Sequence, residues 1–174
     1  MRISVNAGHT KSGAGSGAIY KGFNESEIVR DVANALIKKL KEDGHTVHNS
    51  TVNKATSQRE YLKEACRLAN NSGAELFVSI HCNASASRKG YGVECWTWKG
   101  NKLQQAVNIC ENMAALGFRN RGIKDGRGLY VVKNTKAKAI LVELFFLDNY
   151  TDRKLYLELG ADRIAEAIAT ALKA

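Results

Sequence analysis

Apolar residues alternate with other residues at Ile3 and Val5, and this period of two predicts a strand near the start of the chain. From Ile28 the apolar positions follow helical spacing instead, and this pattern ends at Gly44. The two patterns are separated by a stretch rich in glycine and serine, NAGHTKSGAGSGAIYKGFNESE at positions 6–27. This part of the chain is therefore predicted to form a strand, a long flexible loop and a helix.

The middle of the chain continues the alternation of strands and helices. A short strand is expected at 46–49, and the segment SQREYLKEACRLANNSG at 57–73 is expected to be a helix that opens with a capping box of Ser57 and Glu60. The run ELFVSIHCNA at 75–84 is nearly continuous in apolar residues. Such a run is typical of a central strand that is buried on both faces of a sheet.

The remainder of the chain predicts three further strands and two helices. The strands are YGVECWTW at 91–98, GLYVVK at 128–133 and AILVELFF at 139–146; the helices are KLQQAVNICENMAAL at 102–116 and a segment at 151–173 that is broken at Gly160. This order indicates an α/β fold: a single domain with a mostly parallel twisted sheet of about six strands and helices on both faces. Ligands of such sheets bind beyond the carboxyl ends of the strands.

Composition and charge further restrict the class of protein to which the chain can belong. The chain has 174 residues, of which 44% are hydrophobic and 25% charged, so we expect one soluble domain spanning 1–174. Met1 leads directly into a predicted strand, so no secretory signal is expected, and no apolar stretch is long enough to span a membrane. The four cysteines form no CxxC pair and are expected to be reduced. A net charge of +9 predicts attraction to nucleic acid, anionic lipid or an acidic cell-wall polymer, and charge alone does not choose among them.

Two histidines stand where a sheet of this kind would bind its ligand. His9 follows directly on the first predicted strand, and His81 lies near the end of the strand at 75–84. A lone histidine is more often a hydrogen-bonded structural residue. Two histidines at equivalent ends of parallel strands favour a shared site.

A third ligand is available at the start of the first predicted helix, which carries both Glu25 and Glu27. Asn24 is a suitable N-cap, and Glu27 stands three residues after it, where a glutamate bonds back to the cap. Glu25 instead lies at the top of the apolar stripe that faces the sheet. Glu25 is therefore the better ligand, although an acidic residue in a first helical turn is common for the helix dipole alone.

Two imidazoles and one carboxylate form the donor set of catalytic zinc sites, which keep a fourth position open for water or substrate. Hydrolysis at such a site also needs a base, and Glu143 is the candidate because it interrupts the apolar strand at 139–146. Burial raises the pKa of a carboxyl group and suits it to proton transfer. The same spacing equally allows a structural glutamate paired with a lysine or arginine.

Other features of the chain favour simpler interpretations. The glycine-rich stretch at 6–27 lacks the GK[ST] ending of a phosphate-binding loop. Cys82 adjoins His81, but neighbouring strand residues face opposite sides of a sheet, so the two do not form a thiol nucleophile with its base. Glu94 shares a strand face with Trp96 and could line a groove or face solvent; of the two, we expect it to face solvent.

The candidate residues occur within short motifs: His9 in AGH, Glu25 at the start of the first long helix, His81 in SIHCNA and Glu143 in LVELFFLDN. In order and spacing, the chain resembles the zinc-dependent N-acetylmuramoyl-L-alanine amidases called amidase type 3, as the catalytic domain of a clostridial-phage-like endolysin or a bacterial autolysin. The resemblance runs from end to end and includes EDGHTV, GVE and RGLYVVKN. The chain departs from it at Thr10, where many relatives have glycine, and in lacking a proline before the last strand.

The resemblance implies a function and roles for these residues. The reaction would be hydrolysis, by zinc-activated water, of the amide bond between N-acetylmuramic acid and L-alanine in bacterial peptidoglycan, which lyses the cell wall. His9, Glu25 and His81 would bind Zn²⁺, and Glu143 would be the catalytic glutamate. Asn83 falls at the family's motif asparagine and would contact substrate.

The same resemblance sets expectations for partners and location. We expect a monomer that acts on peptidoglycan and contacts anionic cell-wall polymers, with no nucleic acid and no membrane insertion. It would be made in the cytoplasm and reach the wall on release, or be secreted if the chain is trimmed, and residues 1–174 would contain no cell-wall-binding domain. The alternatives are another zinc amidohydrolase or carboxypeptidase acting on soluble peptides, and a basic binding domain with a structural zinc. Structural zinc sites usually have four ligands rich in cysteine, and only three ligands can be assembled here.

Overall fold

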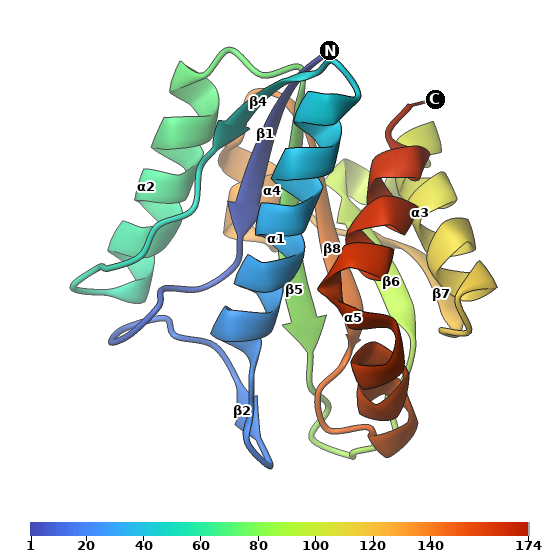
Figure 1. Ribbon diagram of the computed structural model, residues 1–174. Coiled ribbons are helices and arrows are strands. Elements are labelled where there is room, and N and C mark those ends of the chain that lie inside the picture. The colour runs from blue at the N-terminus through green and yellow to red at the C-terminus, as the bar shows by residue number, and fades with distance from the viewer. Residues whose placement is uncertain (174) are drawn as a thin grey trace.

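A computed structural model describes residues 1–173 and consists of one central sheet between two layers of helices (Figure 1). The sheet has six strands in the order β4-β1-β5-β8-β6-β7. All neighbouring strands are parallel except β6 and β8, which are antiparallel. The strands are β1 (Arg2–Ala7), β4 (Thr46–Asn49), β5 (Leu76–Asn83), β6 (Val93–Thr97), β7 (Asn120–Asp125) and β8 (Lys138–Phe146).

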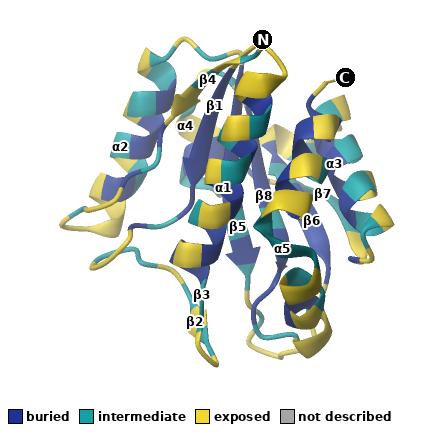
Figure 2. Cartoon of the chain, viewed as in Figure 1, coloured by how far each residue is buried: buried dark blue, intermediate teal, exposed yellow. Residues whose placement is uncertain are grey.

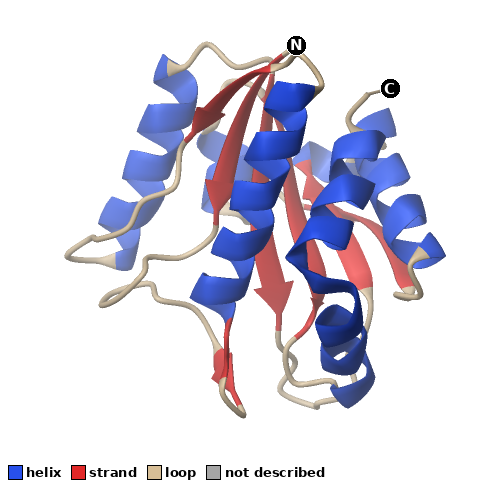
Figure 3. Cartoon of the chain, viewed as in Figure 1, coloured by secondary structure: helices blue, strands red, loops and turns tan. Residues whose placement is uncertain are grey.

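The helices cover both faces of the sheet (Figure 3). One face carries α1 (Glu25–Glu42), α3 (Gln104–Ala115) and α5 (Tyr150–Ala171), and the other carries α2 (Gln58–Asn71) and the short α4 (Tyr130–Asn134). A small hairpin of β2 (Ile19–Tyr20) and β3 (Phe23–Asn24) precedes α1, and a 3₁₀ turn η1 (Trp98–Gly100) follows β6. The fold class predicted from the sequence, a single α/β domain with a mostly parallel six-stranded sheet, is confirmed.

The apolar core lies between the sheet and its helices, and the central strands are buried along nearly their whole length (Figure 2). In β1 even the polar residues Ser4 and Asn6 are fully buried. Their side chains bond to Ser50, which follows β4: Ser4 Oγ donates to Ser50 Oγ at 2.9 Å, and Asn6 Nδ2 donates to the Ser50 carbonyl at 3.0 Å. These bonds satisfy polar groups that would otherwise be costly to bury.

Two elements differ from the sequence prediction. The run at 128–133, expected to be a strand, contains the start of helix α4, whose residues Val131 and Val132 pack against α2. The sixth strand is instead β7, which sequence periodicity missed because its residues are mostly polar and only partly buried. Short β-branched runs are ambiguous between strand and helix, and tertiary packing decides between them. The predicted break in the last helix is confirmed, since Gly160 has φ 72° inside α5.

The topology determines where a ligand can bind. From β1 the chain passes through α1 to β4 on one side, and then through α2 to β5 on the other side of β1. The order therefore reverses between β1 and β5, and crevices at the carboxyl ends of such strands are the usual ligand sites of open α/β sheets. His9 lies two residues beyond the end of β1, and His81 lies near the end of β5.

The four cysteines are free and buried, as predicted. Cys82 packs in the core shared with α1 and α5, and burial raises the pKa of its thiol well above the usual value. Cys82 is therefore not an activated nucleophile. Among residues 1–173, none of the helices combines the length and apolar character needed to cross a membrane.

Candidate active site

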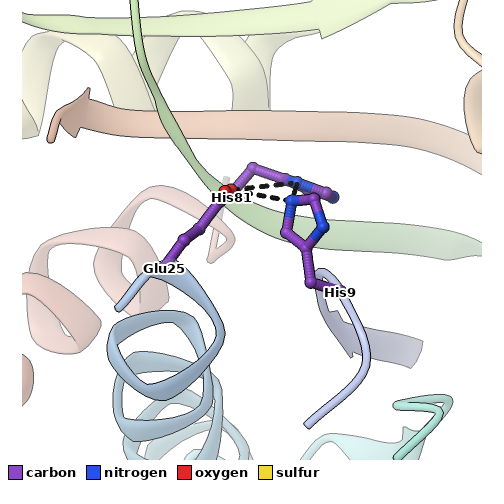
Figure 4. A group of neighbouring side chains, drawn as sticks. All are labelled: His9, Glu25 and His81. Carbon is purple, nitrogen blue, oxygen red and sulfur yellow. Dashed lines mark hydrogen bonds and ion pairs between the residues drawn. The ribbon is translucent and has the colours of Figure 1, made fainter. Parts of the chain in front are cut away.

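His9, Glu25 and His81 converge on one point at the carboxyl end of the sheet (Figure 4). His9 Nε2 lies 2.9 Å from Glu25 Oε1, His81 Nδ1 lies 3.5 Å from the same oxygen, and the two ring nitrogens are 3.2 Å apart. The three residues come from different elements: the loop after β1, the first turn of α1, and β5. The fold thus assembles one cluster from positions far apart in the sequence.

The spacing of these atoms fits a single zinc ion. Zinc bonds to imidazole nitrogen and carboxylate oxygen are about 2.0–2.1 Å long, and tetrahedral geometry places such ligand atoms about 3.3 Å apart. The observed separations of 2.9, 3.2 and 3.5 Å bracket that value. The nitrogen and oxygen donors are also of the types that zinc accepts.

Glu25 is held in place by backbone amides as well as by the histidines. Its Oε1 accepts from the amide of Cys82 at 3.0 Å, and its Oε2 accepts from the amide of Ala18 at 2.9 Å. Glu25 is buried, whereas Glu27 is exposed on the other side of the helix. The Asn24 side chain caps the helix by accepting from the Ser26 amide at 3.0 Å. The first turn of α1 therefore presents Glu25, and not Glu27, to the cluster.

Hydrogen bonds to the outer ring nitrogens orient both histidines. His9 Nδ1 lies 2.9 Å from the carbonyl oxygen of Gly15, which can only accept, so Nδ1 carries the proton and Nε2 keeps its lone pair for a metal. His81 Nε2 lies 3.1 Å from Ser79 Oγ, which in turn donates to Asn6 Oδ1 at 2.8 Å. These second contacts, which sequence reasoning missed, are of the kind that fix the ring orientation of metal ligands.

The charges within the cluster favour an ionised glutamate. Burial by itself raises the pKa of Glu25, but the hydrogen bonds and charges of His81 and His9 outweigh it and hold that pKa well below its usual range. Burial lowers the pKa of His81. Burial also opposes protonation of His9, but the hydrogen bond and charge of Glu25 raise the pKa of His9 overall. The site therefore presents one anionic oxygen and, at His81, a neutral imidazole.

Glu143 stands next to this cluster. It lies directly opposite His81 in the register of β5 and β8, and a cavity of about 550 Å³ is lined by Glu143 and all three members of the cluster. Its Oε2 is buried and has no hydrogen-bond partner, and no lysine or arginine in residues 1–173 forms an ion pair with it. Burial, together with the charges of Glu25 and Glu94, raises the pKa of Glu143 to about 8. The interpretation of Glu143 as a structural partner of a basic residue therefore has no support in the structure.

The buried carboxyl group of Glu143, whose Oε2 has no hydrogen-bond partner in the described part of the chain, predicts that the stability of the metal-free protein depends on pH. Its pKa is about 8 in the folded state against 4.5 for the ordinary side chain, so the folded state binds this proton more tightly. The free energy of unfolding should fall as the pH rises between these values, by at most about 1.4 kcal/mol per pH unit. Glu143→Gln removes the titration and should stabilise the metal-free protein increasingly across that window.

Urea denaturation of the metal-free wild-type and Glu143→Gln proteins across this pH range measures the effect. Glu27→Gln, a change at an exposed helical position, serves as the matched control and should leave the pH profile unaltered. A stability difference between wild type and Glu143→Gln that does not change with pH would contradict this assignment.

The loop between His9 and Glu25 is part of the site and not only a connector. Thr10 is fully buried; its amide donates to the Gly15 carbonyl at 3.1 Å and its hydroxyl to the Ala14 carbonyl at 2.8 Å. This segment, expected from its composition to be a flexible span, therefore has a defined hydrogen-bonded path. That path brings the Gly15 carbonyl to His9 and the Ala18 amide to Glu25.

Gly17 lies where this loop passes closest to the cluster. A Cβ atom at Gly17 would lie 2.8 Å from His9 Cγ and 2.9 Å from Glu25 Oε2, closer than side chains tolerate. Gly17→Ala should therefore displace these two groups and weaken Zn²⁺ binding by about tenfold or more, the usual cost of disturbing residues behind metal ligands. Gly13 provides a matched control, because its φ of 84° nearly equals the 82° of Gly17 but a Cβ there meets nothing within 4 Å.

The comparison of Gly17→Ala with Gly13→Ala separates collision from backbone strain, since both variants place alanine in the left-handed region. Competition with a chromophoric chelator measures the Zn²⁺ affinity of each variant. Equal affinities for the two would show that contact at Gly17 does not shape the site.

Asn83 and Glu94 lie beside the cluster in a polar network. Asn83 Nδ2 donates to Glu94 Oε1 at 2.9 Å, and Arg121 Nε donates to Glu94 Oε2 at 2.7 Å. The expectation that Glu94 faces solvent is wrong, because Glu94 is buried at 2% exposure and is neutralised by Arg121. The pairing of Glu94 with Arg121 could not be predicted, because Arg121 lies in β7, the strand that apolar periodicity did not indicate. The Asn83 amide group is thus already engaged within the protein.

The fold and the site together define a class: an open α/β protein with a candidate mononuclear metal site of two histidines and one glutamate at the switch point of its sheet. The chain belongs to the N-acetylmuramoyl-L-alanine amidase family, whose sequence profile matches residues 3–174. This match confirms the resemblance that the motifs indicated.

Individual relatives agree with the family assignment. The chain is 33% identical over 172 residues to the N-acetylmuramoyl-L-alanine amidase LytC of Bacillus subtilis, covering 95% of this chain and 34% of that protein. It is 31% identical to the endolysin of Bacillus phage SPP1, covering 98% of this chain and 65% of the endolysin. The solved catalytic domain of the CD27L endolysin, described as targeting Clostridia Difficile, superimposes with a TM-score of 0.90 at 29% identity, covering 99% of this chain and 97% of that one.

Most of these relatives are longer than this chain. An uncharacterized protein of Clostridium perfringens is 32% identical over 177 residues, which cover 99% of this chain but 51% of that protein. The chain thus spans about half the length of that relative and about a third of LytC.

Proposed function

We propose that this chain is a zinc-dependent amidase that hydrolyses the bond between N-acetylmuramic acid and L-alanine in bacterial peptidoglycan. The observation that carries the proposal is the convergence of His9, Glu25 and His81 at separations suited to one zinc ion, with Glu143 on the adjoining strand. Membership of the amidase family supports the choice of substrate. Residues 1–174 act together as the catalytic domain in this proposal.

His9, Glu25 and His81 would hold Zn²⁺ at the wall of the cavity that Glu143 also lines. When bound, the ion supplies a Lewis acid that polarises the substrate carbonyl and lowers the pKa of water to about 7. His9 and His81 contribute neutral nitrogen donors, and Glu25 contributes one negative charge. Their outer contacts to Gly15 and Ser79 keep both imidazoles in the orientation that this coordination requires.

Glu143 would act first as the general base and then as the general acid of the reaction. As a carboxylate it accepts a proton from the water that attacks the lactyl carbonyl, and as a carboxylic acid it delivers that proton to the departing alanine nitrogen. A raised pKa suits both steps, because the group must gain and lose a proton near neutral pH. Glu143 lies opposite His81 and lines the same cavity as His9, Glu25 and His81, which supports this role.

The remaining features of the function stay predictions. Asn83 is proposed to contact substrate through the edge of the network that it shares with Glu94. The net charge of +9 supports a proposal that the domain also contacts anionic polymers of the wall. A monomeric state, and action on the wall after release from the cytoplasm, likewise remain predictions.

The proposal is tested by incubating purified cell wall with the zinc-loaded protein and labelling the newly freed amino termini. The expected result is labelled alanine, accompanied by glycan strands that have lost their peptides. Labelled amino acids other than alanine would favour a different peptidase. Cleavage of soluble peptides without any release from the wall would favour the alternative of a carboxypeptidase or another amidohydrolase.

A further inference from the structure

The backbone of His9 adopts a conformation that residues other than glycine rarely take. Its φ is 68°, in the left-handed region, where the side chain crowds its own backbone. Such a conformation persists in a folded protein only where surrounding contacts hold it, and it is concentrated at functional sites. In this chain the contacts that hold His9 come from helices on opposite faces of the sheet.

The first contact comes from α2. The backbone amide of His9 donates a hydrogen bond of 2.7 Å to Tyr61 Oη. Tyr61 is 2% exposed, and its ring stacks on the His9 imidazole with 13° between the planes and 6.5 Å between the centroids. Tyr61 therefore constrains both the backbone and the ring of His9 from one side.

The second contact comes from α1, which Figure 1 shows in front of the sheet, while α2 lies on its other face. Arg30 Nη2 donates to the carbonyl oxygen of His9 at 3.0 Å. Arg30 Nη1 donates to Ser26 Oγ at 2.7 Å, and that hydroxyl donates in turn to the carbonyl of Thr10 at 2.8 Å. One guanidinium group therefore fixes two successive carbonyls, one directly and one through Ser26.

An ion pair does not account for the position of Arg30 beside His9. None of the carboxylates in residues 1–173 forms an ion pair with Arg30, and its acceptors near His9 are neutral oxygens. A positive charge this close to a cation site opposes metal binding by simple repulsion. What Arg30 contributes is the rigid fork of donors, which can bond several oxygens at fixed angles and which lysine cannot reproduce.

We propose that Arg30 and Tyr61 form a clamp that holds His9 in its left-handed conformation and thereby sets the affinity of the site for Zn²⁺. Arg30 binds the carbonyl and Tyr61 binds the amide of the same residue, so the peptide groups on both sides of His9 are fixed before metal arrives. Both act through His9 and are positioning residues. The inference rests on the metal site of the proposed function, but it concerns affinity for the ion and not the reaction.

The test is the Zn²⁺ affinity of Arg30→Lys and Tyr61→Phe, measured with Zn²⁺ alone by competition with a chromophoric chelator. Arg30→Lys keeps the charge but loses the fork, and Tyr61→Phe keeps the ring but loses the hydroxyl. Each should bind Zn²⁺ about 10- to 100-fold more weakly than wild type. The matched controls Arg67→Lys and Tyr150→Phe change the same residue types at exposed positions and should bind as wild type does.

A further comparison distinguishes positioning from general support of the fold. If the clamp acts on His9, the increase in log Kd of the double variant should be smaller than the sum of the two single increases. Both substitutions free the same backbone segment, so the second adds little once the first has freed it. Urea denaturation of the metal-free variants gives the stability of the fold separately. Lower stability with unchanged Zn²⁺ affinity would overturn the clamp.

The outcomes also separate this inference from the proposed function. Variants that bind Zn²⁺ as tightly as wild type would overturn the clamp while leaving the amidase activity standing. Weakened binding in the variants, together with a wild-type protein that releases no alanine termini from cell wall, would support the clamp and overturn the proposed substrate.

Discussion

Glu143→Gln should lower the rate of alanine release from cell wall by about 10²- to 10⁴-fold, the range over which a positioned acid or base usually accelerates a reaction. The substitution keeps the size of the side chain but removes its ability to accept and return a proton. Because Glu143 is not one of the three residues proposed to bind the metal, Zn²⁺ binding should remain stoichiometric. The measurement is the initial rate of release together with the zinc content of the same preparation.

Glu94→Gln is a useful comparison for this variant, because Glu94 lies opposite Glu143 on the neighbouring strand β6 and is also a buried carboxylate. Its two oxygens are occupied by Asn83 and Arg121, so Glu94 is not itself available to transfer a proton, and Glu94→Gln should slow alanine release far less than Glu143→Gln does. If Glu143→Gln retained near-normal activity, Glu143 could not be the base.

His81→Ala should abolish stoichiometric zinc binding. Removing the imidazole leaves only His9 and Glu25, and two protein ligands do not make a zinc site of the usual kind. The loss should appear as less than one zinc per chain after dialysis, and as a loss of activity at least as large as that of Glu143→Gln. Because His81 packs at the end of a buried strand, circular dichroism should be used to check that the variant remains folded.

His48→Ala is the matched control for the metal measurement, since His48 is an exposed histidine in the edge strand β4. It should leave the zinc content unchanged. A His81→Ala protein that is folded and still binds one zinc ion per chain would remove His81 from the ligand set.

The cluster of His9, Glu25 and His81 could be predicted from the sequence because parallel strands place their ends together. His9 and His81 each end an apolar strand pattern, and the pairing of β1 with β5 brings them to the same edge. The choice of Glu25 over Glu27 followed from helical periodicity, which separates the sheet-facing and solvent-facing sides of a first turn. These inferences needed only local patterns and one rule of topology.

The groups that contact this cluster from behind could not be predicted in this way. Gly15 acts on His9 through a carbonyl that every residue possesses, so its sequence carries no sign of the role. Arg30 and Tyr61 meet at His9 from separate helices, and nothing local to either residue indicates that meeting. The same limit explains the errors in the second half of the sheet, where the polar edge strand β7 has little apolar pattern to detect.

The glycine-rich loop between His9 and Glu25 is more ordered than its composition suggests. Glycine and serine suggest a flexible span, yet Gly17 is required by close approach, since a side chain there would meet both His9 and Glu25. The buried Thr10 contributes hydrogen bonds to the turn that carries Gly15. The loop is therefore part of the support for the proposed metal site.

The dependence of the amidase activity on zinc is tested most directly by following alanine release from purified cell wall while Zn²⁺ is returned to the metal-stripped protein. We expect almost no release without metal, and a rate that rises in proportion to added Zn²⁺ until one ion is bound per chain. Full activity in the stripped protein would contradict the proposed zinc-dependent activity, as would a protein that binds one zinc ion at this site and frees no alanine termini.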